Sequence, residues 1–469
     1  MNKKSGKFVW IPAATENDLD GVGLYVTYKK YRLGPISVKR ATGRYLWIDC
    51  PDRDILVQRE RYYAFDPGAV LGLHPESYDE YIHIDVNNSM VMGDLNLEYG
   101  MLNALSISGS GHRKNIGDRN KKHTKLIVDS GGFQLYSGVA NFIKPEDVIE
   151  TQNLQGDLGM VLDLPCPQAI NLEFAKKLAR IQKANTKIMV ANKRDDLELI
   201  NIIHGMEPHL YKPYRDMIER DDIDRVAFGT ARREDNPLKG VRKITDLLTM
   251  PGRRYKQYHV LGISDIVKTI PIMWLAKMGV APLITVDSST HVRNAANGMY
   301  LAYSTVRSPL QKLEVSRKYT HPSRLSTLPC GCAVCSRLKY SDTFAFIPGA
   351  LMSRVLTFHN LLEYRKYMAT IFQLVLDAEN IDEFLKEVRW SITRDRYEEV
   401  RIGIQMAQLG ANEGMEAVDK KYHFHLHQAN SKTAGLFQNS IMNNSKEAAR
   451  FAWLNKKVAE YFKYHGLKE

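Results

Sequence analysis

Residues 126–132 read LIVDSGG, a short apolar run that ends in an acidic residue and two glycines. Similar runs recur along the chain, beginning near residues 160, 200, 226, 259 and 283, and polar or glycine-bearing sequence follows each of them. Helical spacing separates several of them, as in LEFAKKLARIQKAN at 172–185. Short buried strands that alternate with helices predict a parallel sheet. Six runs fit both a closed (β/α) barrel and an open doubly wound sheet.

The sequence on either side of these runs has a different character. Residues 25–57 alternate β-branched or aromatic residues with charges and turn residues, which predicts two or three antiparallel strands. After about residue 360 the spacing becomes helical. The final 39 residues, from Ser431, hold seven Lys/Arg against three Asp/Glu. We therefore expect a β-rich N-terminal part and a helical, basic C-terminal part.

Composition narrows the class of protein. The chain has 469 residues, 44% of them hydrophobic and 25% charged, which is the balance of a soluble globular protein. It contains no apolar run of membrane-spanning length, and Pro12 interrupts the one short apolar stretch near the start, so we expect a cytoplasmic protein with no membrane partner. The formal charge of +12 and a pI near 9.2 favour a polyanionic partner.

Three cysteines are clustered as Cys330-x-Cys332-x2-Cys335, with Gly331 enabling a tight turn. Clustered thiols in a reducing compartment favour metal ligation over a disulfide framework. With His359 they would complete a closed tetrahedral shell, which is typical of a structural zinc site. Other histidines remain alternatives for the fourth ligand: His321, His423, His425 and His427.

Three carboxylates, Asp129, Asp163 and Asp287, each come directly after an apolar run. A lone Asp at a strand end is usually a cap or turn residue, but three at equivalent barrel positions would meet at one mouth. One carboxylate as nucleophile and another handling protons is the arrangement that chemistry at a glycosyl C1′ requires. Beside Asp129, Gly131 and Gly132 would let a planar base or a sugar approach the backbone.

Basic residues are concentrated in predicted loops beside these strands. The stretch HRKNIGDRNKKHTK at 112–125 holds six Lys/Arg, including Lys121 and Lys122, and Arg232 and Arg233 follow the run at 226. These residues either bind phosphate or form solvated charged loops.

Three motifs together resemble one known family. Residues 129–134 (DSGGFQ) look like a signature of the tRNA-guanine transglycosylases, and Val286-Asp287 through Gly298 resembles their FDC…TRNARNG segment. The Cys330/Cys332/Cys335 set with His359-Asn360 resembles their zinc site. The resemblance implies a (β/α)8 TIM-type barrel with a zinc-binding insertion, and the residue pattern adds an N-terminal β segment and a helical C-terminal extension. We expect limits of 1–110, 111–370 (zinc subdomain at about 325–365) and 371–469.

The resemblance also implies an enzyme, a pentosyltransferase. Asp287 would attack C1′ of the target nucleotide and Asp129 would transfer protons to and from the exchanging bases. The second substrate would be a free 7-deazaguanine base, and structural Zn²⁺ the one cofactor. Residues implied in base binding are Asp163, Ser130, Gly131, Phe133, His204 and Gly229, and Arg293 is implied in nucleic-acid binding. The basic stretches add Lys121, Lys122, Arg232 and Arg233 as further candidates for nucleic-acid binding.

Two departures from the family pattern concern the nucleic acid. His204 stands where the family has a base-contacting Gln, and Ala296 replaces the second Arg of the TRNARNG segment. This combination resembles the DNA-directed branch, the DpdA-like enzymes of phages and bacteria, with 7-cyano-7-deazaguanine as the expected base and a bacterial or phage-infected cell as the setting. A tRNA enzyme and a non-catalytic nucleic-acid-binding subunit are the alternatives, and a helper protein or a homodimer is a further expectation.

Overall fold

A computed structural model describes residues 5–13, 22–27, 37–42, 45–50, 53–58, 83–90, 97–105, 125–136, 139–165, 171–204, 208–229, 236–252, 254–303, 311–314, 332, 349–389, 392, 394–427 and 437–468. The chain forms two compact units. Unit 1 comprises Met1–Ala13, Glu98–Ser288 and Met368–Glu469, and unit 2 comprises Ala14–Leu97 and Ser289–Tyr367. The domain limits expected at 110 and 370 stay predictions.

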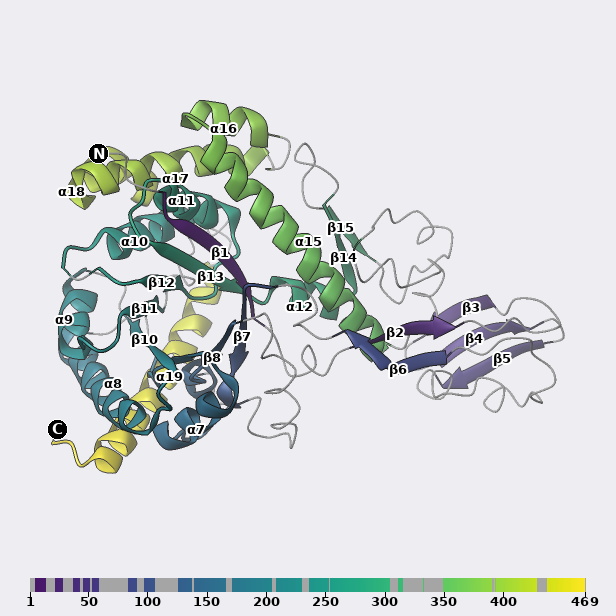
Figure 1. Ribbon diagram of the computed structural model, residues 1–469, viewed down its shortest axis with the longest axis horizontal. Coiled ribbons are helices and arrows are strands. Elements are labelled where there is room, and N and C mark those ends of the chain that lie inside the picture. The colour runs from purple at the N-terminus through teal and green to yellow at the C-terminus, as the bar shows by residue number, and fades with distance from the viewer. Residues whose placement is uncertain are drawn as a thin grey trace. The chain divides into compact units, whose positions relative to one another are not determined.

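Unit 1 is built on eight parallel strands (Figure 1). They are β1 (Lys7–Pro12), β7 (Tyr99–Asn103), β8 (Lys125–Asp129), β9 (Leu158–Met160), β10 (Glu198–Ile203), β11 (Arg225–Phe228), β12 (Gln257–Val260) and β13 (Leu283–Ser288). β1 pairs with β13, and the order then runs back through the chain to β7. A parallel bridge from Ala13 to Met101 joins the two edges. The predicted (β/α)8 barrel is confirmed.

Helices connect the strands, as the spacing predicts. They are α6 (Gly132–Tyr136), α7 (Pro145–Gln155), α8 (Leu172–Asn192), α9 (Pro208–Ile218), α10 (Pro237–Thr249) and α11 (Ile266–Lys277). Three of them begin at a side-chain cap, because Asn171, Asn236 and Asp265 each accept a hydrogen bond from a first-turn N–H. Each cap fixes where the chain leaves a strand-end loop and turns into a helix.

The barrel interior is apolar over most of its circumference. Alternate residues of β1 and β7 to β11 point inward and form one buried cluster: Ile11, Tyr99, Met101, Ile127, Leu158, Met160, Ile200, Ile202 and Ala227. The period of two along each strand places these side chains on a single face. This part of the interior is therefore a packed core.

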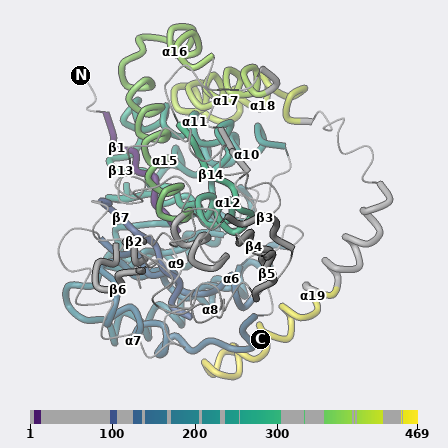
Figure 2. Tube along the Cα trace, turned by 90° about the vertical axis from the view of Figure 1, so that its right-hand side faces the viewer, coloured from purple at the N-terminus to yellow at the C-terminus, as the bar shows by residue number. Residues whose placement is uncertain are grey.

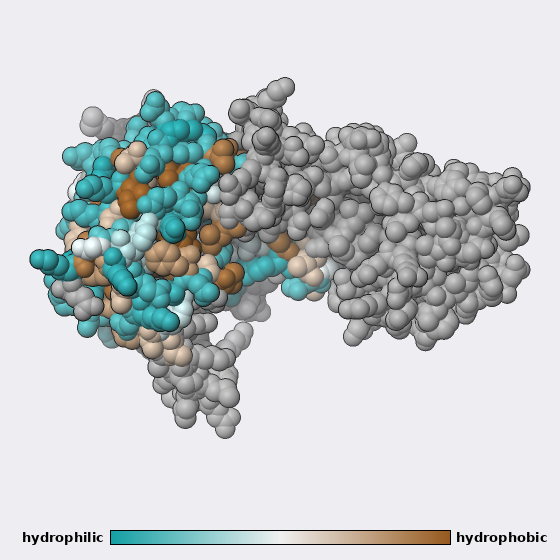
Figure 3. Space-filling view, turned by 90° about the horizontal axis from the view of Figure 1, so that it is seen from below, coloured by the Kyte–Doolittle hydropathy of each residue, from teal (hydrophilic) through white to brown (hydrophobic). Residues whose placement is uncertain are grey.

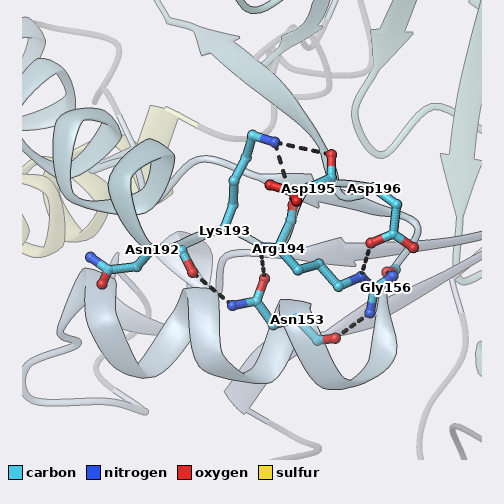
Figure 4. A network of polar contacts seen from close by, with 7 residues as sticks. All are labelled: Asn153, Gly156, Asn192, Lys193, Arg194, Asp195 and Asp196. Atoms are coloured by element: carbon cyan, nitrogen blue, oxygen red, sulfur yellow. Dashed lines mark hydrogen bonds and ion pairs between the residues drawn. The ribbon is translucent and has the colours of Figure 1, made fainter.

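An arginine organises the amino end of the barrel beside β10 (Figure 4). The Arg194 guanidinium donates to the carbonyls of Asn153 and Gly156, the latter at 2.5 Å, and its Nε donates to Asp196 at 2.6 Å. The Arg194 backbone N–H donates back to Asn153 Oδ1 at 2.8 Å. These contacts satisfy carbonyls at the C-terminus of α7, where a positive charge is favourable.

The C-terminal part is helical, as predicted: the end of α15 (Gly349–Asp377), α16 (Ile381–Val388), α17 (Arg394–Glu413), α18 (Met415–His427) and α19 (Phe437–His465). α17 and α18 lie beside α10 and α11, and the end of α19 lies beside α8 (Figure 2). Arg242 of α10 forms a bidentate pair of hydrogen bonds with the Asp419 carboxylate of α18. Arg180 of α8 donates to the Lys468 carbonyl at 2.6 Å.

Figure 3 shows one face of the molecule coloured by residue hydropathy. In the view of Figure 3 the coloured surface is largely hydrophilic, with hydrophobic residues in patches between hydrophilic ones. None of the helices in the described ranges combines the length and the apolar character that a membrane span needs.

Unit 2 consists of small antiparallel sheets and helices. β2 (Val22–Thr27) pairs with β6 (His83–Met90), and β3 (Ser37–Thr42), β4 (Tyr45–Cys50) and β5 (Arg53–Gln58) form a second sheet. The antiparallel strands expected over 25–57 are thus present. β14 (Met299–Ala302) pairs with β15 (Gln311–Glu314), and α12 (Thr290–Ala296) and the first part of α15 also belong to the unit.

Candidate active site

Asp129 is the last residue of β8 and is partly buried. Asn103, at the end of β7, donates its amide to Asp129 Oδ2 at 3.1 Å. Burial, reinforced by the negative charges of Asp163 and Asp287, raises the pKa of Asp129 to about 7. A carboxyl group with this pKa can both give and take a proton near neutrality, as general acid–base catalysis requires.

Asp163 lies just beyond β9 and is buried. Ser130 Oγ donates to its Oδ1 at 2.9 Å, and His204 Nε2 lies 2.6 Å from its Oδ2. Both carboxylate oxygens are thus held by side chains from the ends of β8 and β10. Asp163 and His204 form one rigid polar pair at the barrel mouth.

Glycines make room for this pair. A Cβ on Gly132 would lie 2.6 Å from the Asp163 carbonyl oxygen and from Oδ1, and one on Gly229 would lie 2.4 Å from the His204 ring. Gly131 has a φ of +84°, which disfavours any other residue. We expected the DSGG glycines to admit a base or a sugar. In the structure the space beside Gly132 holds the protein's own carboxylate.

Asp287 lies within β13 and is buried. The Gly262 N–H donates to its Oδ1 at 2.5 Å, and His259 Nε2 lies 3.3 Å from the same oxygen. Within the described part of the chain, Oδ2 has no comparable contact. The carboxylate is therefore anchored by one oxygen and keeps the other for a reacting partner.

The predicted site residues of unit 1 that the structure describes gather at the carboxyl end of the barrel. They are Asp129, Ser130, Gly131, Phe133, Asp163, His204, Gly229 and Asp287. Phe133 is 54% exposed at the start of α6, so its ring is accessible for stacking. Carboxyl ends of parallel strands are where barrel enzymes place their chemistry.

The remaining predicted residues belong to unit 2 or lie outside the described residues. Arg293 is exposed on α12, which belongs to unit 2. Lys121, Lys122, Arg232 and Arg233 lie outside the described residues, as do the metal-ligand candidates Cys330 and Cys335.

Two of the four predicted zinc ligands are described, both in unit 2. Cys332 Sγ lies 3.5 Å from His359 Nδ1, and His359 Nε2 lies 2.7 Å from the Leu301 carbonyl oxygen. The His359 ring is buried and stacks on Tyr300. No group of three candidate ligands occurs among the described residues. The His359 geometry fits a zinc ligand, because the carbonyl fixes Nε2–H and leaves the Nδ1 lone pair facing the sulfur.

Several residues of the site have no sequence signal that points to them. Asn103 ends β7, a strand without a clear apolar run, and Gly262 contributes through its backbone. His259 is hidden in the run that begins at 259, which reads as an ordinary buried strand. The one signal for His259 is that a polar residue stands within an apolar run.

Comparisons with known proteins place these residues in a wider context. A model of the queuine tRNA-ribosyltransferase family matches residues 112–404. A queuine tRNA-ribosyltransferase of Haemophilus ducreyi is 26% identical over 301 residues, which cover 56% of this chain and 73% of that protein. One of Thermodesulfovibrio yellowstonii is 25% identical over 310 residues, covering 59% and 76%. The matched span contains β8 to β13 and all three carboxylates.

Proposed function

Because this chain belongs to the queuine tRNA-ribosyltransferase family, a family of pentosyltransferases, we propose that it exchanges guanine in a nucleic acid for a free 7-deazaguanine base. The observation that carries the proposal is the grouping of Asp129, Asp163 and Asp287 at one end of the barrel, with the pKa of Asp129 raised to about 7. This reaction requires a nucleophile and a group that transfers protons, both at the same site.

The proposed reaction has two halves. Asp287 Oδ2 attacks C1′, the bond from C1′ to the guanine nitrogen breaks, and Asp129 gives its proton to the leaving base. The incoming base then loses a proton to Asp129 and attacks C1′, which releases Asp287 as a carboxylate. Each half passes through an oxocarbenium-like transition state. The target nucleotide has to leave its stack for C1′ to be reached.

Asp163 and His204 are proposed to bind the edge of the base. Asp163 accepts from Ser130 and lies 2.6 Å from His204 Nε2, so its position is fixed before the base arrives. A buried polar pair discriminates strongly against bases that leave it unsatisfied. Phe133 is proposed to stack on the base plane.

We propose DNA as the nucleic acid. Support comes from Ala296, an exposed alanine on α12 where the tRNA enzymes that the chain resembles carry an arginine, and from His204 in place of a glutamine. The names of the curated relatives favour tRNA, which makes tRNA the second candidate.

One exchange experiment separates the two candidates. Purified protein is incubated with labelled guanine, and separately with 7-cyano-7-deazaguanine, in the presence of duplex DNA or bulk tRNA. We expect incorporation into DNA alone. Incorporation into tRNA alone would replace the DNA proposal with the tRNA one. Failure with both substrates, together with no denaturant-stable protein–nucleic acid adduct, would overturn base exchange itself.

Structural zinc is proposed at Cys330, Cys332, Cys335 and His359. A closed shell of three thiolates and one imidazole stabilises the surrounding fold and leaves no position for substrate. Elemental analysis should find about one zinc per chain. Cys332→Ser should lose the metal and lower the melting temperature, with the choice of base unchanged. A zinc-free protein of full thermal stability would contradict this.

A further inference from the structure

We infer that His259 is a positioning residue for Asp287, held in one proton arrangement by a chain of hydrogen bonds that begins at Arg225. The inference rests on the proposed role of Asp287 as the nucleophile. It goes further because it gives a positioning role to four residues that are not proposed to contact the substrate: Arg225, Gln257, Thr285 and His259.

The chain of contacts is continuous. Arg225 Nη1 donates to Gln257 Oε1 at 2.7 Å, and Gln257 Nε2 donates to Thr285 Oγ1 at 3.0 Å. Thr285 Oγ1 lies 2.9 Å from His259 Nδ1, and His259 Nε2 lies 3.3 Å from Asp287 Oδ1. At its origin Arg225 is paired with Glu198 at 2.6 Å. The chain therefore runs from the amino end of β10 and β11 to the carboxyl end of β13.

Strand register explains why these side chains meet. His259 of β12 lies opposite Thr285 of β13, and opposite the inward-facing Ala227 of β11. Because side chains alternate along a strand, Gln257 and His259 share the inner face of β12. Gln257, His259 and Thr285 have no exposed surface. This polar sector interrupts an otherwise apolar interior, and buried polar groups are costly unless they are bonded.

The direction of each hydrogen bond follows from the chemistry of the donors. A guanidinium can only donate, so Arg225 fixes which end of the Gln257 amide is the oxygen. The Gln257 amide nitrogen then donates to Thr285. The Thr285 hydroxyl hydrogen is left for His259 Nδ1 at 2.9 Å in preference to the Tyr258 carbonyl at 3.4 Å.

This order fixes the tautomer of the imidazole. Since Nδ1 accepts from Thr285, a neutral His259 ring carries its hydrogen on Nε2, the atom that faces Asp287. The Gly262 N–H faces the same oxygen. The Gly262 N–H thus holds Oδ1 by a hydrogen bond, and His259 Nε2 faces the same oxygen at 3.3 Å without hydrogen-bond alignment, which leaves Oδ2 for the proposed attack. When the ester to C1′ breaks in the second half-reaction, the same donors receive the returning negative charge.

A tautomer measurement tests the chain without any substrate. In protein labelled with ¹⁵N-histidine, the signals of His259, assigned by their loss in His259→Gln, should be those of a neutral ring with hydrogen on Nε2. Thr285→Val should shift the ring toward a mixture of tautomers, and Thr285→Ser should restore the Nε2–H form. A wild-type ring with hydrogen on Nδ1, or spectra identical in Thr285→Val, would overturn the relay.

Kinetics test what the relay does. His259→Phe should lower kcat for base exchange about 100-fold and leave KM for the nucleic acid nearly unchanged, because Asp287 is misoriented and binding is not. His259→Gln, which presents an amide N–H near the Nε2 position, should recover most of kcat. Wild-type kcat in His259→Phe would refute the positioning role, as would a KM effect alone. If His259→Phe does not fold, Thr285→Val carries the test, with a loss of about tenfold expected.

The two proposals fail separately. A wild-type protein that neither exchanges bases nor forms an adduct removes the proposed function, and the tautomer measurement still decides whether the relay exists. A wild-type protein that exchanges bases while His259→Phe matches it removes only the role of His259.

Discussion

At the amino end of the barrel, Lys7 is paired with Glu98, Lys256 with Asp224 and Arg225 with Glu198, each within 2.6 Å. At the carboxyl end, Asp129, Asp163 and Asp287 lie close enough for the latter two to raise the pKa of the first. Among the described residues, no lysine or arginine is paired with any of these three. The same eight strands thus carry compensated charge at one end and uncompensated like charge at the other.

The paired charges at the amino end favour stability, and the unpaired carboxylates at the carboxyl end favour reactivity. Opposite charges at the amino end cost little to hold together, while three carboxylates at one mouth repel one another and favour protonation of one. Residues held against their own preference are found at functional sites more often than elsewhere. Hydrogen bonds from Arg225 to His259, and a 3.3 Å contact from His259 to Asp287, connect the two ends.

The largest effect is expected from the carboxyl end. Asp287→Asn should lower base exchange by at least about 10⁴-fold and abolish the covalent adduct, because an amide is a poor nucleophile. The measurements are steady-state exchange and adduct trapping. Asp224→Asn, at the amino end, is the matched control and should exchange at the wild-type rate. Normal exchange by Asp287→Asn would show that the nucleophile is another residue.

Asp129→Asn should separate stability from activity. The folded-state pKa of Asp129 is raised to about 7, so the folded protein keeps a proton that the unfolded chain loses at lower pH. Its contribution to stability is full below about pH 4 and is lost as pH rises toward 7 and beyond. At pH 8 the variant should therefore be more stable than wild type, by about 4 kcal/mol, while exchange falls by about 100-fold or more.

Chemical denaturation at pH 4 and pH 8 checks this prediction. The gain in the free energy of unfolding should be present at pH 8 and absent at pH 4. A variant that is less stable than wild type at pH 8 would mean that Asn103 and the backbone stabilise the carboxylate more than burial and repulsion destabilise it.

Arg194→Met should lower stability and leave base exchange unchanged, the reverse of Asp129→Asn. It removes the bonds to the carbonyls of Asn153 and Gly156 at the end of α7, so we expect a loss of about 2 kcal/mol in stability. Exchange measured well below the melting temperature should be unchanged, since Arg194 lies at the amino end. Arg194→Lys, which keeps the charge without the fork of donors, should recover part of the loss. A drop in kcat with unchanged stability would break the division of labour between the two ends.

The smallest effect is expected for a single exposed pair. Lys256 is 71% exposed where it meets Asp224, so Lys256→Gln should change the free energy of unfolding by no more than about 0.5 kcal/mol. The urea midpoint measures this. A loss of several times that size would mean that the amino-end pairs act as a coupled network.

The strands and the grouping of carboxylates could be predicted from the sequence because each apolar run is a local pattern. The residue that follows such a run lies at the carboxyl edge of the sheet. The run at 126–128 and Asp129 show this directly. Closure of the barrel had no such signal, because the first segment of unit 2, Ala14–Leu97, separates β1 from β7, and β1 pairs with a strand that begins at residue 283. Resemblance to a known family supplied it.

The polar sector inside the barrel was not predicted, since periodicity records which face a residue occupies and not which donor it meets. Gln257, His259 and Thr285 occupy positions that an apolar residue would fill equally well by pattern alone. Their pairing depends on the register between β12 and β13. The roles of the basic loops and of the complete cysteine set stay predictions.

The pairing of β1 with β13 also governs how the molecule can be made. Lys7 is translated long before its partner Leu283, which follows the other strands of the barrel. At about 5–20 residues per second, β1 waits on the order of tens of seconds with an open edge. Asp287 arrives on the very strand that ends this wait. Translation of β13 therefore supplies both the proposed nucleophile and the partner strand of β1. A nascent chain that ends before β13 has neither of them.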